Sequence, residues 1–178
     1  MNSDHKFALG GGGYCLYGPR YPRFQDRPGF ADPVSVFSAE LPNMFFLQVL
    51  ENSLPVPMTL TERKLTDGKA VMSYNLGRGL RATETRMVTQ DDRFVSLLEL
   101  QNTGKTDRQL TTVVWTTTDP EGEAVSLEGD SFRVKRNLES FGHSQVPVEI
   151  VGSSPDSKGA KAMQPFFAEG GSDRPDWE

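Results

Sequence analysis

Aromatic and arginine side chains gather near the N-terminus of this 178-residue chain and are its strongest candidates for ligand binding. The cluster consists of Tyr14, Tyr17, Arg20, Tyr21, Arg23 and Phe24. Flat aromatic rings stack on sugar faces, and the guanidinium fork of arginine donates hydrogen bonds to hydroxyls or carboxylates. These residues therefore suggest a carbohydrate-binding surface. The simpler alternative, which stays open, is that they pack an ordered N-terminal loop against a sheet.

The four consecutive glycines at 10–13 invite comparison with loops that cradle phosphate groups. Such loops follow a strand and precede a helix, and the P-loop adds a lysine followed by serine or threonine. The stretch that follows the glycines, "YCLYGPRYP", has no helical pattern and no lysine followed by serine or threonine. We therefore interpret the glycines as a bent entry into a strand. The single cysteine, Cys15, excludes an internal disulfide and a cysteine-based zinc cage. We predict no cofactor and no metal site.

The histidines and carboxylates do not form a recognisable catalytic pattern. His5 and His143 are far apart, and Ser144 beside His143 lacks the G-x-S-x-G context of a nucleophile elbow. Acidic residues cluster at 119–123 and 169–178, in stretches typical of loops. Glycoside hydrolysis needs two carboxylates facing each other across a sugar, and sequence does not show facing. We therefore assign no catalytic residue and interpret these acids as solvated turns.

Composition and charge narrow the classes of partner. The net charge of -5 argues against nonspecific binding to nucleic acid or to an anionic membrane, since both need a basic face. No apolar run approaches the roughly 20 residues of a membrane-spanning helix, and the first residues lack a signal-peptide pattern. The chain is therefore expected to be soluble and cytoplasmic.

Alternation of apolar and polar residues predicts strands almost throughout the chain. The stretches are 58–65, 70–76, 80–88, 94–102, 109–118, 124–134 and 146–152. Turn residues at 67–69 (DGK), 102–107 (NTGKTD) and 128–130 (EGD) predict hairpins between neighbouring strands. No window shows sustained helical spacing with a cap. The pattern predicts an all-β fold, an antiparallel β-sandwich whose loop-rich tail suggests that it is incomplete.

Three regions are expected along the chain. Residues 1–33, rich in glycine, proline and aromatic residues, form an N-terminal segment that packs on the sheet. Residues 34–151 form the sandwich core. Residues 152–178 form a loop-rich tail whose apolar side chains are expected to need a partner surface or a continuation of the chain.

Three stretches, taken in order, resemble a known family. They are a glycine-rich aromatic start (FALGGGGYCLYGPR, 7–20), a charged, threonine-rich strand (GLRATETRMVTQDDRFV, 79–95) and a strand–turn–strand stretch (LLELQNTGKTDRQLTTVVW, 97–115). Together they resemble the N-terminal β-super-sandwich domain of the six-hairpin glycosidases, which has a galactose-mutarotase-like fold. That family includes debranching-type amylo-α-1,6-glucosidases, glucoamylase-like enzymes and disaccharide phosphorylases.

The resemblance implies a noncatalytic, carbohydrate-associated domain, the N-terminal part of a glycoside hydrolase or phosphorylase. In that family the general acid and base belong to an (α/α)₆ barrel that follows the sandwich, so no catalytic residue is carried over to this chain. The partners it implies are a carbohydrate, a catalytic barrel domain or partner subunit outside these residues, and a second copy in a homodimer. Two alternatives stay open. One is a stand-alone aldose mutarotase- or epimerase-like enzyme, for which His143 is the only central histidine, and the other is a protein-interaction β-sandwich module.

Overall fold

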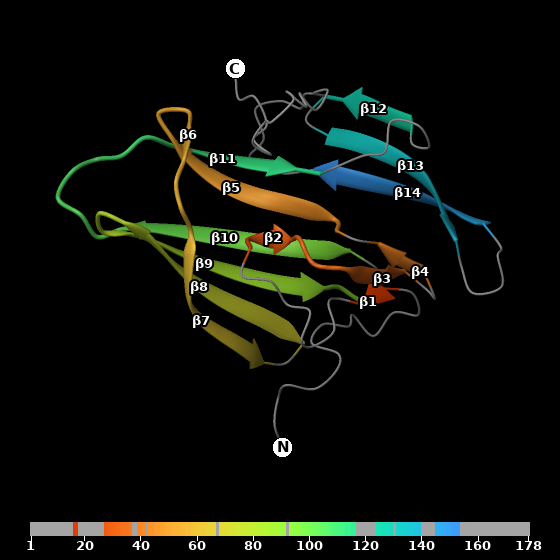
Figure 1. The fold of residues 1–178 in the computed structure, drawn as a ribbon, viewed down its shortest axis with the longest axis horizontal. Coiled ribbons are helices and arrows are strands. Elements are labelled where there is room, and N and C mark those ends of the chain that lie inside the picture. Colours follow the sequence, from red (N-terminus) through yellow and green to blue (C-terminus); the bar gives the residue numbers. More distant parts are fainter. Residues whose placement is uncertain are drawn as a thin grey trace, which may run out of the picture. The chain divides into compact units, whose positions relative to one another are not determined.

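The computed structural model describes residues 16–17, 27–36, 39–41, 43–66, 68–91, 93–116, 124–129, 131–139 and 145–153 (Figure 1). Its strands are β1 (Leu16–Tyr17), β2 (Gly29–Phe30), β3 (Val34–Val36), β4 (Ala39–Leu41), β5 (Phe45–Glu51), β6 (Leu54–Pro55), β7 (Thr59–Thr66), β8 (Lys69–Gly77), β9 (Leu80–Val88), β10 (Phe94–Asn102), β11 (Leu110–Trp115), β12 (Ala124–Glu128), β13 (Ser131–Glu139) and β14 (Gln145–Ser153). All strand pairings among the described residues are antiparallel, and these residues contain no helix. The predicted all-β, antiparallel, sandwich-like fold is therefore confirmed.

The chain divides into two compact units, residues 1–116 and 117–178. The first unit contains a β1-β3-β4 sheet, a β10-β9-β8-β7 sheet and a β11-β5-β2 sheet with β6 paired to β5. The second unit contains the β12-β13-β14 sheet. In the part of the chain that the structure describes, no helix is long and apolar enough to cross a membrane. The three regions expected from the sequence stay a prediction.

The β7–β10 sheet has one buried and one exposed face, because side chains alternate along each strand. On β9 the buried residues are Leu80, Ala82, Glu84, Arg86 and Val88. We call the face that carries them the inner face and the opposite one the outer face. Arg78 and Gly79 form the turn between β8 and β9, and both have positive φ (51° and 78°). A positive φ at both central residues suits the right-handed twist of the flanking strands.

Phenylalanine rings form the apolar contact between the β7–β10 sheet and the sheet of β2, β5 and β11. Phe30 of β2 is fully buried. Its ring meets Phe45 of β5 edge-on at 5.5 Å between centroids and Phe94 of β10 at 5.0 Å. Gly29, beside it, has φ of 89°, and a Cβ there would lie 2.7 Å from the carbonyl oxygen of Phe45. Glycine is therefore required where β2 crosses the core.

The stretch from β10 to β11 contains two strands, as predicted, but the prediction that they pair as a hairpin is wrong. β10 pairs with β9, whereas β11 pairs with β5 from the other sheet. The connection between them is held to the fold by Arg108, which donates to both carboxylate oxygens of Glu51 at 2.7 Å. The amide of Thr103 also donates to the carbonyl of Gly79 at 2.8 Å. A polar turn marks a chain reversal, but these distant partners decide which strand the returning chain joins.

In the second unit, β12 and β13 form the hairpin predicted at 128–130, with Gly129 at φ 59°. β14 corresponds to the strand predicted at 146–152. The register places Val125 opposite Val134, whose side chain is 1% exposed. Gly152 lies opposite Phe132, and a Cβ there would collide with the Phe132 ring.

Candidate functional site

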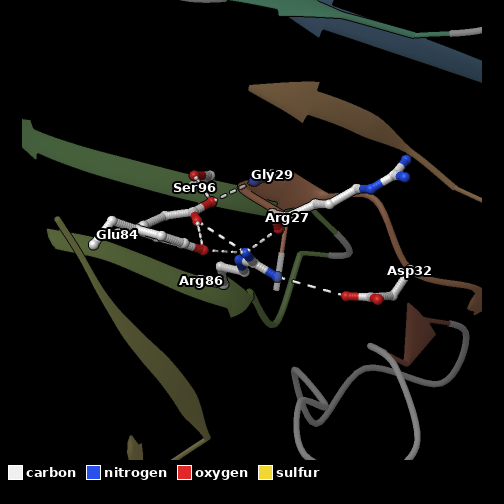
Figure 2. Close-up of polar contacts among 7 residues, drawn as sticks. Arg27, Gly29, Asp32, Glu84, Arg86 and Ser96 are labelled. Carbon is white, nitrogen blue, oxygen red and sulfur yellow. Dashed lines mark hydrogen bonds and ion pairs between the residues drawn. The ribbon is translucent and has the colours of Figure 1, made fainter. Parts of the chain in front are cut away.

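A cluster of ionisable side chains is buried on the inner face of the β7–β10 sheet (Figure 2). Glu84 and Arg86 extend from β9 and are 0% and 1% exposed. Asp32, which follows β2, is also 0% exposed. Burying a charge is costly unless opposite charges and hydrogen bonds compensate it. The contacts of this cluster therefore decide what it can do.

The Glu84 carboxylate accepts hydrogen bonds on both of its oxygens. Oε1 accepts from the backbone amide of Gly29 and from Ser96 Oγ, both at 2.7 Å. Oε2 accepts from Tyr74 Oη at 3.1 Å and from Arg86 Nη2 at 3.0 Å. The donors come from β2, β8, β9 and β10, so one carboxylate joins strands of two sheets.

Arg86 compensates the buried negative charge and also links two backbone segments. Its Nη2 donates to Tyr74 Oη at 2.8 Å and to the carbonyl oxygen of Arg27, and its Nη1 lies 3.6 Å from Asp32 Oδ2. Burial disfavours the charged guanidinium, but Glu84, Tyr74 and Asp32 together outweigh that effect and raise the pKa of Arg86. The arginine therefore stays charged. Its Nε and Nη1 have no hydrogen-bond partner among the described residues.

Tyr74 completes the cluster as a hydroxyl that both accepts and donates. Burial is the main cause that raises the pKa of Tyr74, and the negative charge of Glu84 acts in the same direction. The phenol therefore stays neutral and keeps its proton for Glu84. A general acid or base must reach the proton of a substrate. Glu84 is 0% exposed and already binds four donors of the protein, so the cluster stabilises the fold and is not an active site.

The outer face of the same sheet carries a hollow of about 730 Å³, within the range of small-molecule sites. The residues that line it are Thr61, Glu62, Ser73, Tyr74, Asn75, Arg81, Ala82, Thr83, Glu99, Leu100 and Gln101. Tyr74 is 1% exposed and its hydroxyl belongs to the inner cluster, so it offers no ring to this surface. The hollow is lined mainly by hydroxyl, amide, carboxylate and guanidinium groups.

Strand register arranges these polar groups in two rows. One row runs across all four strands through Glu62, Ser73, Thr83 and Glu99. The next row runs through Asn75, Arg81 and Gln101, and these three residues are exposed. Neighbouring strands lie roughly 4.8 Å apart, so adjacent side chains in a row can contact one small ligand. This surface, which we call the polar rows, is the candidate binding site.

The structure does not place the site predicted from the N-terminal aromatic and arginine residues. Tyr17 lies in β1, and its side chain is not among those described. The other predicted residues lie outside the described residues: Tyr14, Arg20, Tyr21, Arg23 and Phe24. The glycine run, Cys15, both histidines and the acidic stretches at 119–123 and 169–178 lie outside them as well.

Sequence reasoning missed the buried cluster, although a signal for it was present. In the strand at 80–88, period two places Glu84 and Arg86 on the same face as Leu80, Ala82 and Val88. Charges that share a face with apolar residues indicate a buried ion pair. The charged and threonine-rich composition of this stretch does not reveal the pair, whereas the division of its residues between two faces does.

Within the described ranges, no three His, Cys, Asp or Glu side chains are placed to hold a metal ion. Comparison with known protein families and with curated proteins finds no match to this chain. The candidate site is therefore defined by its own geometry.

Proposed function

We propose that this chain is a noncatalytic, carbohydrate-binding β-sandwich domain that binds sugar on the polar rows. We further propose that it is the N-terminal part of a glycoside hydrolase or phosphorylase, acting with an (α/α)₆ barrel outside these residues. The observation that carries the binding proposal is the hollow on the outer face of the β7–β10 sheet. The family assignment is supported by the sequence resemblance alone.

The chemistry of the polar rows suits a neutral sugar. A sugar hydroxyl both donates and accepts, and it pairs well with planar groups that present two polar atoms side by side. Arg81 offers donors, Glu99 offers acceptors, and Gln101 offers both. These three side chains are exposed and lie on adjacent strands. The proposal therefore assigns them direct contacts with sugar hydroxyls.

The noncatalytic part of the proposal is supported by the state of the buried carboxylates. Asp32 and Glu84 are both 0% exposed. Glu62 and Glu99 line the hollow and are exposed. Glycosidases need one carboxyl group with a raised pKa, which burial provides, and another facing it across the sugar. Within the β7–β10 sheet, Glu84 lies on the inner face, whereas Glu62 and Glu99 lie on the outer face.

Titration of the protein with α-glucan oligosaccharides and disaccharides, followed by amide NMR shifts, tests the binding site. We expect shifts on the outer face of β8, β9 and β10 and a dissociation constant on the order of 1 mM, because exposed hydrogen bonds are individually weak. Arg81→Ala and Glu99→Ala should each weaken binding by about three- to tenfold.

Arg93→Ala is the matched control, since Arg93 is exposed, pairs with Asp91 and is not among the residues lining the hollow. Shifts that avoid β8 to β10 and disappear with Tyr14→Ala or Tyr21→Ala would instead place sugar on the N-terminal aromatic cluster. No shift with any sugar would contradict a carbohydrate-binding function.

Turnover assays test the noncatalytic assignment separately. The purified chain should neither hydrolyse nor phosphorolyse these sugars, and it should not accelerate anomer interconversion of glucose or galactose. A rate that is lost with His143→Ala would favour the mutarotase-like alternative. Hydrolysis that is lost when one carboxylate is changed would contradict the proposal.

A further inference from the structure

The strand β11 forms an edge of its sheet. β5 is the only described strand that pairs with it, since the sheet order is β11-β5-β2. An edge strand presents a row of backbone N–H and C=O groups on its open side, and a further strand can bind there. Thr111, Thr112 and Val114 are exposed, and Val114 exposes 44% of its surface.

The edge strands β7 and β2 carry features that hinder strand addition, and the long edge strand β10 carries the charged Glu99, whereas β11 has none of these features. The edge strand β7 has the charged run Glu62, Arg63 and Lys64, and its register shifts between Leu60 and Glu62. The edge strand β2 has only two residues. Charges, bulges and short length are the usual protections of an edge. β11 is LTTVVW, with no charge, glycine or proline and with unbroken register against β5.

We propose that β11 pairs antiparallel with β11 of a second copy of this chain, across a two-fold axis through Val113. A two-fold axis perpendicular to the sheet keeps each face of one copy continuous with the same face of the other copy. Residues that lie opposite each other across the axis must therefore both have odd numbers or both have even numbers. Centring on Val113 places Val113 opposite its own copy, Thr112 opposite Val114 and Thr111 opposite Trp115. The product is one sheet that continues through both copies.

A second copy suits this edge because every pair in that register is uncharged and contains a β-branched residue. Such pairs are favourable across strands, whereas like charges placed opposite each other are not. Self-pairing of β7 would bring charged side chains of the two copies close together. Trp115 is also held in place, since its ring stacks on Phe46 at 4.2 Å between centroids. This inference does not depend on sugar binding.

Sedimentation velocity over a concentration series tests the interface. We expect a dimer at micromolar concentration, with a dissociation constant raised at least tenfold by Thr111→Lys or Thr112→Lys. Thr59→Lys, the same change on the exposed side of the β7 edge, should leave the dimer intact. A wild-type chain that stays monomeric up to 100-fold higher concentration, about 100 µM, would overturn the proposal. So would a dimer that the β11 variants do not weaken.

Cysteine cross-linking tests the register. In a Cys15→Ser background, Val113→Cys places two thiols opposite each other across the axis, within reach of a disulfide. Diamide, which takes up the two electrons and two protons of the thiol pair, should convert this variant to a covalent dimer. Thr111→Cys faces Trp115 of the other copy and should not cross-link. Cross-linking of Thr111→Cys but not of Val113→Cys would refute this register.

Discussion

The two faces of the β7–β10 sheet contain similar residue types, buried on one face and exposed on the other. On the inner face Glu84 and Arg86 are buried with Tyr74 and Asp32. On the outer face, Arg81 of β9 and the neighbouring Glu99 of β10 line a hollow and are exposed to solvent. Inside, every change in charge alters the folding free energy, because water cannot replace a lost partner. On the outer face, water can replace a lost hydrogen-bond partner, so charged side chains there are free to contact a ligand without a large loss of stability.

Substitution of Glu84 gives the largest expected contrast between the faces. Glu84→Gln keeps the shape but leaves the positive charge of Arg86 without its nearest carboxylate, which costs about 3–5 kcal/mol of unfolding free energy. Glu99→Gln on the outer face should cost less than about 0.5 kcal/mol. Urea denaturation of both variants measures the difference. Equal losses of unfolding free energy in the two variants would show that burial does not make the inner-face carboxylate more important for stability than the outer-face one.

Tyr74→Phe tests the hydroxyl that joins Glu84 to Arg86. Removing it should cost about 1–2 kcal/mol, since two buried hydrogen bonds are lost. The raised pKa of Tyr74 also predicts a pH dependence. The folded state binds the phenol proton of Tyr74 more tightly than the unfolded state does. The stabilisation that comes from this difference is therefore complete below about pH 10, the pKa of the unfolded state, and declines as the pH rises further.

Denaturation curves between pH 8 and about pH 11 measure that decline. In Tyr74→Phe the part of the decline due to this phenol should be missing, whereas Tyr21→Phe is expected to keep it. A decline of unchanged steepness in Tyr74→Phe would contradict the buried position of the hydroxyl.

Glu51 is intermediate in exposure between Glu84 and Glu99, and its substitution should have a smaller effect than that of Glu84 or Tyr74. Its side chain is 23% exposed, and the hydrogen bond from Arg108 holds its pKa below the usual value. The stabilisation is therefore present above the unfolded pKa, near 4.3, and is lost as pH falls through the lower folded pKa. Glu51→Gln should lower the urea midpoint at pH 7 and reduce its fall between pH 5 and about pH 3. An unchanged acid profile would mean that the Arg108 pair does not contribute.

Much of the fold follows from local patterns. The strand at 80–88 was predicted within its observed bounds because apolar residues alternate there. The hairpins at 67–69 and 128–130 were predicted because Gly68 and Gly129 can adopt positive φ, and both do. The candidate site could not be predicted in the same way, since the polar rows exist only when four strands are aligned in register.

By itself, the sequence determined that this chain forms antiparallel strands, where many of them turn, and which residues share a face of each strand. These are properties of neighbouring residues, set by the period of two and by the conformations that turn residues allow. Only the tertiary structure decided that β11 pairs with β5, more than 50 residues away in the sequence, and not with β10. It also decided that the Glu84 carboxylate accepts a hydrogen bond from the backbone amide of Gly29. Such contacts depend on packing and on the compensation of buried charge, which no short stretch of the chain contains.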